Sequence, residues 1–88
     1  MSHDAYSQEI TRAAWFVETG QYERAMQILA RLLAAYPDNA STTYKVMAEA
    51  HKSVERFEDA EAEARKALAA LPNDPDAHRL LAQALISQ

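Results

Sequence analysis

The sequence contains no cysteine and only one glycine among its 88 residues. Without cysteine there can be neither a disulfide framework nor a thiolate metal site, and a reducing compartment is favoured. A single glycine, Gly20, cannot build the glycine-rich loops that cradle phosphates, so we do not expect nucleotide binding. We expect a cytoplasmic protein.

Positive charge and long apolar runs are also scarce. Nine lysines and arginines face thirteen acidic residues, and the net charge is −4. A surface that follows phosphate backbones needs clustered Lys and Arg, so nucleic acid is not expected as a partner. No apolar run approaches the roughly 20 residues that cross a bilayer, and Met1 to Asp4 do not begin a basic leader. The sequence predicts a soluble protein without a membrane partner.

Catalytic and metal-binding patterns are missing as well. The histidines His3, His51 and His78 lack ligand spacing among themselves, and no serine accompanies a suitably placed histidine and acid. His51 and Glu55 lie one helical turn apart, which a helix-surface contact explains more simply than a metal site. We therefore predict no enzyme activity, no metal and no cofactor, with His51 and His78 as half-buried packing residues.

The sequence does contain an internal repeat. The segment from Gly20 to Asn39 recurs 35 residues later, from Glu55 to Asp74. Each copy has an aromatic residue, an alanine three residues later, and a proline near its end: Tyr22, Ala25 and Pro37, then Phe57, Ala60 and Pro72. A repeat of this length is typical of stacked helical arrays.

Hydrophobic spacing and helix-stop residues predict five helices, over about residues 5–18, 22–35, 41–54, 57–70 and 75–86. Gly20 ends the first helix in a left-handed conformation, and Glu55 is expected to adopt the same conformation at a cost of ~1 kcal/mol. Asp74 and Pro75 suit the cap and first turn of the last helix. Five acidic residues in and after the turn at Glu55 are predicted to form a solvated helix face: Glu55, Glu58, Asp59, Glu61 and Glu63.

Three groups of motifs follow one another along the chain. They are Gly20-x-Tyr22-x-x-Ala25 with Leu33 and Pro37; Tyr44-x-x-Met47-Ala48-x-x-His51 with Phe57-x-x-Ala60, Ala67-Leu68 and Pro72; and Asp74-Pro75-x-Ala77-His78-x-x-Leu81-Ala82-x-x-Leu85. In this order they resemble a tetratricopeptide repeat (TPR) protein over nearly the whole chain. The resemblance implies an all-α fold of antiparallel helix hairpins stacked as a short right-handed superhelix, with two and a half repeats.

The resemblance also implies an organisation within one domain, residues 1–88. Repeat 1 would cover about residues 5–37, repeat 2 about 41–72, and a terminal helix about 75–87. The repeats are 35 residues apart rather than the usual 34 of the family, so we expect one extra residue between Pro37 and Thr43. Ala25 and Ala60 should lie where helices cross.

The implied function is non-catalytic binding of a protein or peptide in a concave groove lined by the first helix of each pair. The predicted groove residues are Lys45, Val46, Glu49, Lys52, Arg79, Leu80, Gln83 and Ile86, with Asp76 beside them. Aliphatic positions alternate with charges, which suits an amphipathic helix or an extended segment. Relatives that hold chaperone tails need Lys, Asn and Arg where this chain has Ile10, Ala14, Val46, Asp76 and Leu80, so that activity is not expected.

The first helix leaves alternatives open. Strict alignment buries Glu9 and Arg12, so we expect a rotation of about one residue that favours the apolar stripe Tyr6, Ile10, Ala13, Ala14 and Val17. Ile10, Ala14 and Val17 then belong either to the groove or to the core. Trp15 is either a binding anchor or a packing residue, and we favour packing.

The fifth helix has no following helix to cover it. We expect Leu81 and Leu85 to point into the stack and Leu80 and Ile86 to point outward. A longer array, a second copy of the chain or a ligand could cover the exposed end. The alternative functions are therefore a structural scaffold that self-associates into a homo-oligomer through this helix, or a regulatory domain of a larger assembly.

Overall fold

The computed structural model describes the backbone of residues 2–88 and the side chains of residues 5–88. Within this range it contains helices and no strand, which confirms the predicted all-α class. The elements are α1 (Ser2–Glu18), α2 (Tyr22–Ala35), the 3-10 helix η1 (Pro37–Asn39), α3 (Ala40–Ser53), α4 (Phe57–Ala70) and α5 (Pro75–Ile86).

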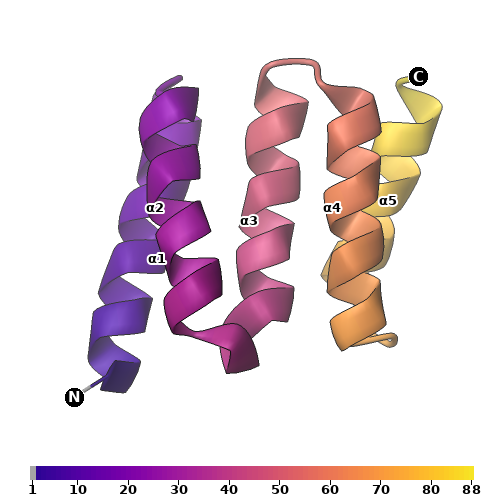
Figure 1. Cartoon of the computed structure of the whole chain (residues 1–88). Helices are drawn as coiled ribbons and strands as arrows, with labels where there is room; N and C mark the ends of the chain where they lie inside the picture. Colours follow the sequence, from indigo (N-terminus) through magenta and orange to yellow (C-terminus); the bar gives the residue numbers. More distant parts are fainter. Residues whose placement is uncertain (1) are drawn as a thin grey trace.

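Consecutive helices run antiparallel, with α1 behind α2 and α5 behind α4 in the view of Figure 1. Each helix packs against its neighbours in sequence, and α3 also packs against both α1 and α5. Helices α2 and α4 do not contact each other in the described chain. The molecule measures 39 × 29 × 17 Å, so it is about two helices thick, with α1, α3 and α5 forming one layer.

The turns that follow α1 and α3 have the same geometry. Gly20 has φ 77° and Glu55 has φ 61°, so both adopt the predicted left-handed conformation. The amide of the next residue bonds back to the helix: Gln21 N donates to the Phe16 carbonyl at 2.8 Å, and Arg56 N donates to the His51 carbonyl at 2.9 Å. These bonds satisfy carbonyls that the helix end would otherwise leave unpaired.

The extra residue of the first repeat lies in the first turn of α3. Helix α3 begins at Ala40, four residues before Tyr44, whereas α5 begins at Pro75, three residues before the equivalent His78. The start of α5 is also capped as predicted, because the Asp74 carboxylate accepts a bond from the Asp76 amide at 3.0 Å.

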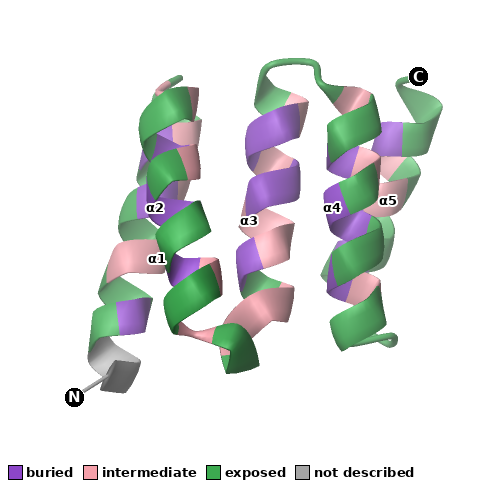
Figure 2. Cartoon of the chain, in the orientation of Figure 1, coloured by how far each residue is buried: buried purple, intermediate pink, exposed green. Residues whose placement is uncertain are grey.

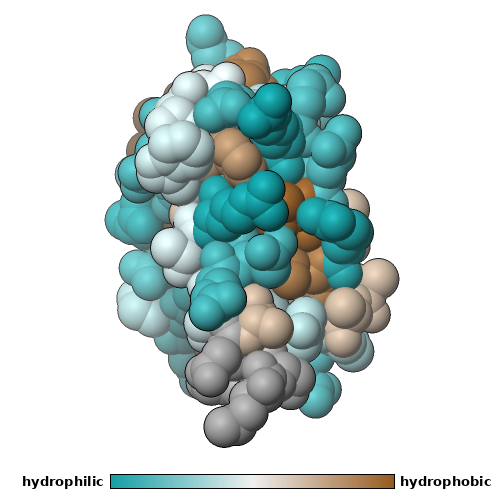
Figure 3. Space-filling model, turned by 90° about the vertical axis from the view of Figure 1, so that its left-hand side faces the viewer, coloured by the Kyte–Doolittle hydropathy of each residue, from teal (hydrophilic) through white to brown (hydrophobic). Residues whose placement is uncertain are grey.

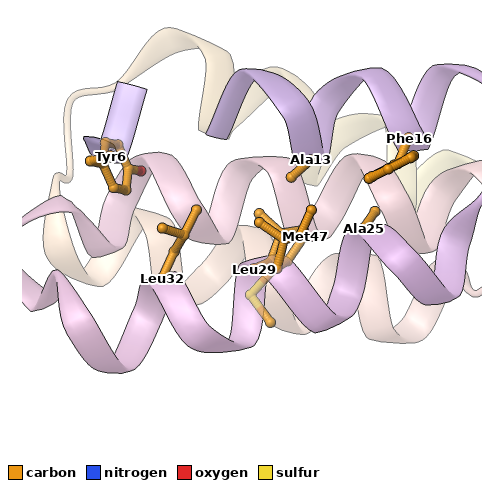
Figure 4. Close-up of a cluster of buried hydrophobic side chains, with 8 residues drawn as sticks. Tyr6, Ala13, Phe16, Ala25, Leu29, Leu32 and Met47 are labelled. Atoms are coloured by element: carbon orange, nitrogen blue, oxygen red, sulfur yellow. The ribbon is translucent and has the colours of Figure 1, made fainter. Parts of the chain in front are cut away.

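The core lies between the two layers and continues along the whole stack. Figure 2 shows buried residues along α3 and on the side of α4 that faces it. In the larger cluster, Ala13 of α1, Leu29 of α2 and Met47 of α3 point into the same space (Figure 4). A smaller cluster joins α3, α4 and α5 through Ala48, Ala64 and Leu80.

Alanine accounts for the close approach of the helices. Ala25 and Ala60 are almost completely buried, in agreement with the prediction that they lie at helix crossings. Ala50, Ala64, Ala67, Ala77 and Ala84 are buried in the same way. A methyl group lets two helix backbones approach, but each such residue removes little apolar area from water.

The expected apolar stripe of α1 does face the core. Tyr6 and Ala13 are buried, and Ile10 and Val17 pack against the same core cluster. Arg12, which strict alignment of the repeats places toward the interior, lies on the outer surface of α1 and α2, in agreement with the expected rotation. Trp15 is 53% exposed, so the expectation that it packs within the molecule is wrong.

The predicted orientation of α5 is confirmed for Leu81, which packs against the core, and for Ile86, which is exposed, but it is wrong for Leu80 and Leu85. Leu80 is 3% exposed and packs against Ala48 and Ala64, whereas Leu85 is 47% exposed. Helix α5 therefore turns Ala77, Leu80 and Ala84 toward the stack and leaves Leu85 outside. Because both sides of this helix carry leucine, hydrophobic periodicity alone does not distinguish them.

Candidate functional site

The layer of α1, α3 and α5 encloses a hollow of about 320 Å³, which we call the groove. Its lining residues are Ala14, Val17 and Glu18 of α1, Lys45, Val46 and Glu49 of α3, and Asp76, Arg79 and Leu80 of α5. Five of the eight predicted groove residues are among them: Lys45, Val46, Glu49, Arg79 and Leu80.

The floor of the groove is aliphatic. Val17 comes from α1, Val46 from the middle of α3, and Leu80 from the inward face of α5. Ala14 and Val17 are half-buried, and Val17 also packs against the core. Of the three residues left open between groove and core, Ala14 and Val17 therefore lie at the boundary, whereas Ile10 packs against the core and does not line the hollow.

Charged side chains form the rim. Lys45 Nζ lies 2.6 Å from an Asp74 carboxylate oxygen and 3.9 Å from Asp76. Arg79 lies 3.9 Å from Glu49 and 4.0 Å from Asp76. Both cations of the rim therefore already have acidic neighbours.

One carboxylate of the rim is free. Among the described residues Glu18 has no ion pair, and the lining holds three acidic side chains against two basic ones. Glu18 was not predicted as a groove residue. The available signal was its position at the end of α1, one helical turn after Ala14.

Asp74 does not line the groove, but it positions Lys45, which does. It is buried, and its carboxylate both accepts the Asp76 amide and pairs with Lys45. The hydrogen bond from Lys45, with help from the backbone amides of Asp76 and Ala77, holds the pKa of Asp74 below its usual range. The N-cap of α5 thereby fixes a basic side chain on α3, a role that the sequence did not reveal.

Three predicted groove residues do not line the hollow. Lys52 Nζ donates a hydrogen bond to the side-chain oxygen of Gln83 at 2.7 Å, which ties α3 to α5. Ile86 is 84% exposed in the last turn of α5. Leu80 does line the hollow, but it does so as a buried floor residue rather than as the outward-facing side chain that we predicted.

A polar network between α2, α3 and α4 involves His51. The Tyr22 hydroxyl lies 3.0 Å from His51 Nδ1, and His51 Nε2 lies 4.0 Å from Glu63. Burial lowers the pKa of His51, although the nearby carboxylates of Glu63 and Asp59 oppose this effect. Glu63 is buried, so its prediction as part of a solvated acidic face is wrong.

The other histidines give no site. His78 is exposed rather than half-buried, and its ring lies 2.9 Å from the Pro72 carbonyl oxygen. His3 lies outside the side chains that the structure describes. Among the described residues, no group of three or more His, Cys, Asp or Glu side chains is arranged to hold a metal ion. In this same part of the chain, every helix is too short or too polar to cross a membrane.

Antiparallel helix hairpins stacked in series, with α1, α3 and α5 around a shared hollow, define a helical-repeat protein. A sequence model described as tetratricopeptide repeat matches residues 16–84, and the chain belongs to this family. Searches among curated proteins and among solved structures found no match. Repeats of this family generally mediate protein–protein interactions and are typically non-catalytic.

Proposed function

We propose that this chain is a non-catalytic module that binds a short helix or extended segment of another protein in the groove of α1, α3 and α5. The observation that carries this proposal is the aliphatic floor of Val17, Val46 and Leu80 inside a charged rim. Apolar floors supply affinity and a few placed charges supply orientation in such sites.

The rim also indicates the chemistry of the ligand. Lys45 and Arg79 are already paired with carboxylates, whereas Glu18 has no ion pair within the part of the chain that the structure describes. A ligand with an aliphatic side chain next to a lysine or arginine would cover the floor and pair with Glu18. Charge complementarity of this kind fixes register and raises the association rate.

The test uses random peptides displayed on phage and selected on the purified chain. Recovered peptides should be enriched in an aliphatic residue next to Lys or Arg, and calorimetry should show that Val46→Asp weakens their binding at least tenfold, because the carboxylate would have to be buried in the apolar floor. Ala30→Asp, at an exposed position of α2, is the matched control. Equal binding to wild type and Val46→Asp would place the ligand elsewhere.

A second function, self-association through α5, has its own supporting observation. On α3, Tyr44 lies beside Lys66 of α4, and His51 lies beside Glu63 of α4. The equivalent positions of α5 are His78 and Leu85. Leu85 and Ile86 are both exposed. Light scattering over a concentration series should then show a molecular mass that increases with concentration, and Leu85→Lys should abolish this increase. The mass of a monomer at all concentrations would exclude a homo-oligomer.

A regulatory role within a larger assembly is the remaining alternative, and it would use the same groove. A cytoplasmic location remains a prediction from the sequence. Fluorescence microscopy of the tagged chain in its host would test the location directly.

A further inference from the structure

A second hollow lies on the outer surface of α1 and α2. It has a volume of about 220 Å³ and is lined by Arg12, Phe16, Arg24, Gln27, Ile28 and Arg31. Figure 3 views the molecule from this end and shows apolar surface in the middle of the face, bordered by hydrophilic side chains. We call this surface the arginine hollow. It shares no lining residue with the groove.

The arrangement follows from the two helices. Arg24, Ile28 and Arg31 recur on α2 at the spacing that places side chains on one face of a helix. Arg12 and Phe16 are one turn apart on α1, which packs alongside. Two neighbouring helices therefore bring three arginines to one place.

The charge of the hollow is positive although the protein as a whole carries −4. None of the six lining side chains is acidic. The Arg12 guanidinium lies 3.7 Å from Glu9 on the exposed surface of α1. Among the described residues, no carboxylate lies within ion-pair distance of Arg24 or Arg31. Two of the three guanidinium groups are thus available to a ligand.

The floor holds two of the three guanidinium groups, those of Arg12 and Arg24. Their Cζ atoms lie 5.5 and 5.8 Å from the centre of the Phe16 ring, within the range of a cation–π contact. Phe16 and Ile28 are buried in the core cluster, and close packing restricts their movement. A guanidinium that already rests on a ring loses less conformational entropy when it binds a ligand.

We propose that the arginine hollow binds an acidic segment of a partner protein, through Asp or Glu carboxylates on Arg24 and Arg31. The planar guanidinium forms paired hydrogen bonds to a carboxylate, and Gln27 adds an amide beside them. Trp15 is exposed next to this surface, with its ring centre 5.3 Å from that of Phe16, and offers an apolar contact for a residue that flanks the acids. This proposal is independent of the groove.

Trp15 also provides the measurement, since it is the one tryptophan of the chain. The probe is a synthetic peptide of Asp and Glu residues around one Leu, without aromatic residues. Its addition should change the Trp15 fluorescence saturably, whereas the matched peptide of Asn and Gln should not. The apparent affinity should fall as NaCl rises from about 50 to about 500 mM, because salt screens charges at an exposed surface.

Substitutions assign the response to the hollow. Arg24→Gln and Arg31→Gln should each weaken the binding of the acidic peptide by up to about fivefold, the upper end of the effect of losing one exposed ion pair. Arg65→Gln, on the exposed surface of α4, should leave it unchanged. Circular dichroism should show that each variant is folded.

Several results would overturn the proposal. These are an equal response to the neutral peptide, an equal loss with Arg65→Gln, or tighter binding of a single-stranded oligonucleotide than of the acidic peptide. A mass that rises with concentration and returns to the monomer with Arg24→Gln would identify a second copy of the chain as the occupant instead. Failure of the groove in the phage experiment would leave this test unaffected.

Discussion

Single residues set the turns of this protein, and two of them occupy the same unusual backbone conformation. At Gly20 a side chain would meet no atom within 4 Å, so the preference for glycine comes from the backbone alone. We expect Gly20→Ala to lower the free energy of unfolding by about 1 kcal/mol, and Glu55→Gly to raise it by up to ~1 kcal/mol. Urea unfolding would measure both changes.

The control for this pair is Glu55→Ala, which removes the charge but keeps a Cβ atom at positive φ. It should show none of the gain that glycine gives. Equal stabilisation by Ala and Gly at position 55 would mean that the charge of Glu55, rather than its conformation, is unfavourable.

His51 is the residue through which pH acts on stability. Because burial lowers its pKa below the ordinary value, the unfolded chain takes up a proton first as the pH falls. The contribution of the neutral ring is complete above about pH 6.5 and is lost as the pH falls from there toward the pKa of the folded protein. The midpoint of thermal unfolding should therefore decrease from pH 7 to pH 5.

Substitution of His51 should weaken this dependence of thermal stability on pH. In His51→Gln the decrease between pH 7 and pH 5 should become smaller, while His78→Gln, at an exposed position, should keep the wild-type profile. Glu63 and Asp59 work against the effect by favouring the charged ring. An identical profile in wild type and His51→Gln would show that these carboxylates cancel the effect of burial.

Among the elements, α5 carries leucines on both its buried and its exposed side. Leu80 packs into the cluster of Ala48 and Ala64, and Leu85 faces outward. Leu80→Ala should cost about 2–5 kcal/mol, since it empties a buried site, whereas Leu85→Ala should change stability by less than about 0.5 kcal/mol. Denaturant midpoints would decide, and a larger loss at Leu85 would reverse the orientation of the helix.

The helices themselves were predictable, whereas their faces were only partly so. Gly20, Pro37 and Pro72 stop helices through local backbone chemistry, so the boundaries could be read within a few residues. The face of α5 could not, because its leucines lie on both sides and because Leu85, which matches the buried His51 of α3, is left exposed.

The site was predictable to a similar extent. Repeat positions identified Val46, Lys45 and Arg79, which depend only on the register of α3 and α5. The burial of Glu63 beside His51 and the arginine hollow were not identified. Each depends on how the side chains of two consecutive helices meet, which the periodicity of a single helix does not give.

For the whole molecule, the order of contacts predicts where unfolding begins. In the described chain each helix contacts only helices that are one or two places away, and α3 alone contacts all four others. Stability in such linear stacks is shared between nearest neighbours. Hydrogen exchange should therefore be slowest in α3 and faster in α1 and α5, and uniform protection along the chain would contradict a stack that opens from its ends.

The thickness of 17 Å also limits the change in heat capacity when the protein unfolds. Between the two layers of helices there is room for only one layer of side chains, and many of these side chains are alanines. Unfolding consequently exposes little apolar surface, and apolar exposure is the main source of the increase in heat capacity. The increase in heat capacity on unfolding should be about 12 cal/mol/K per residue or less, at or below the lower end of the usual range. The curve of stability against temperature should therefore be broad and shallow. Well below the midpoint of thermal unfolding, the stability should change little with temperature.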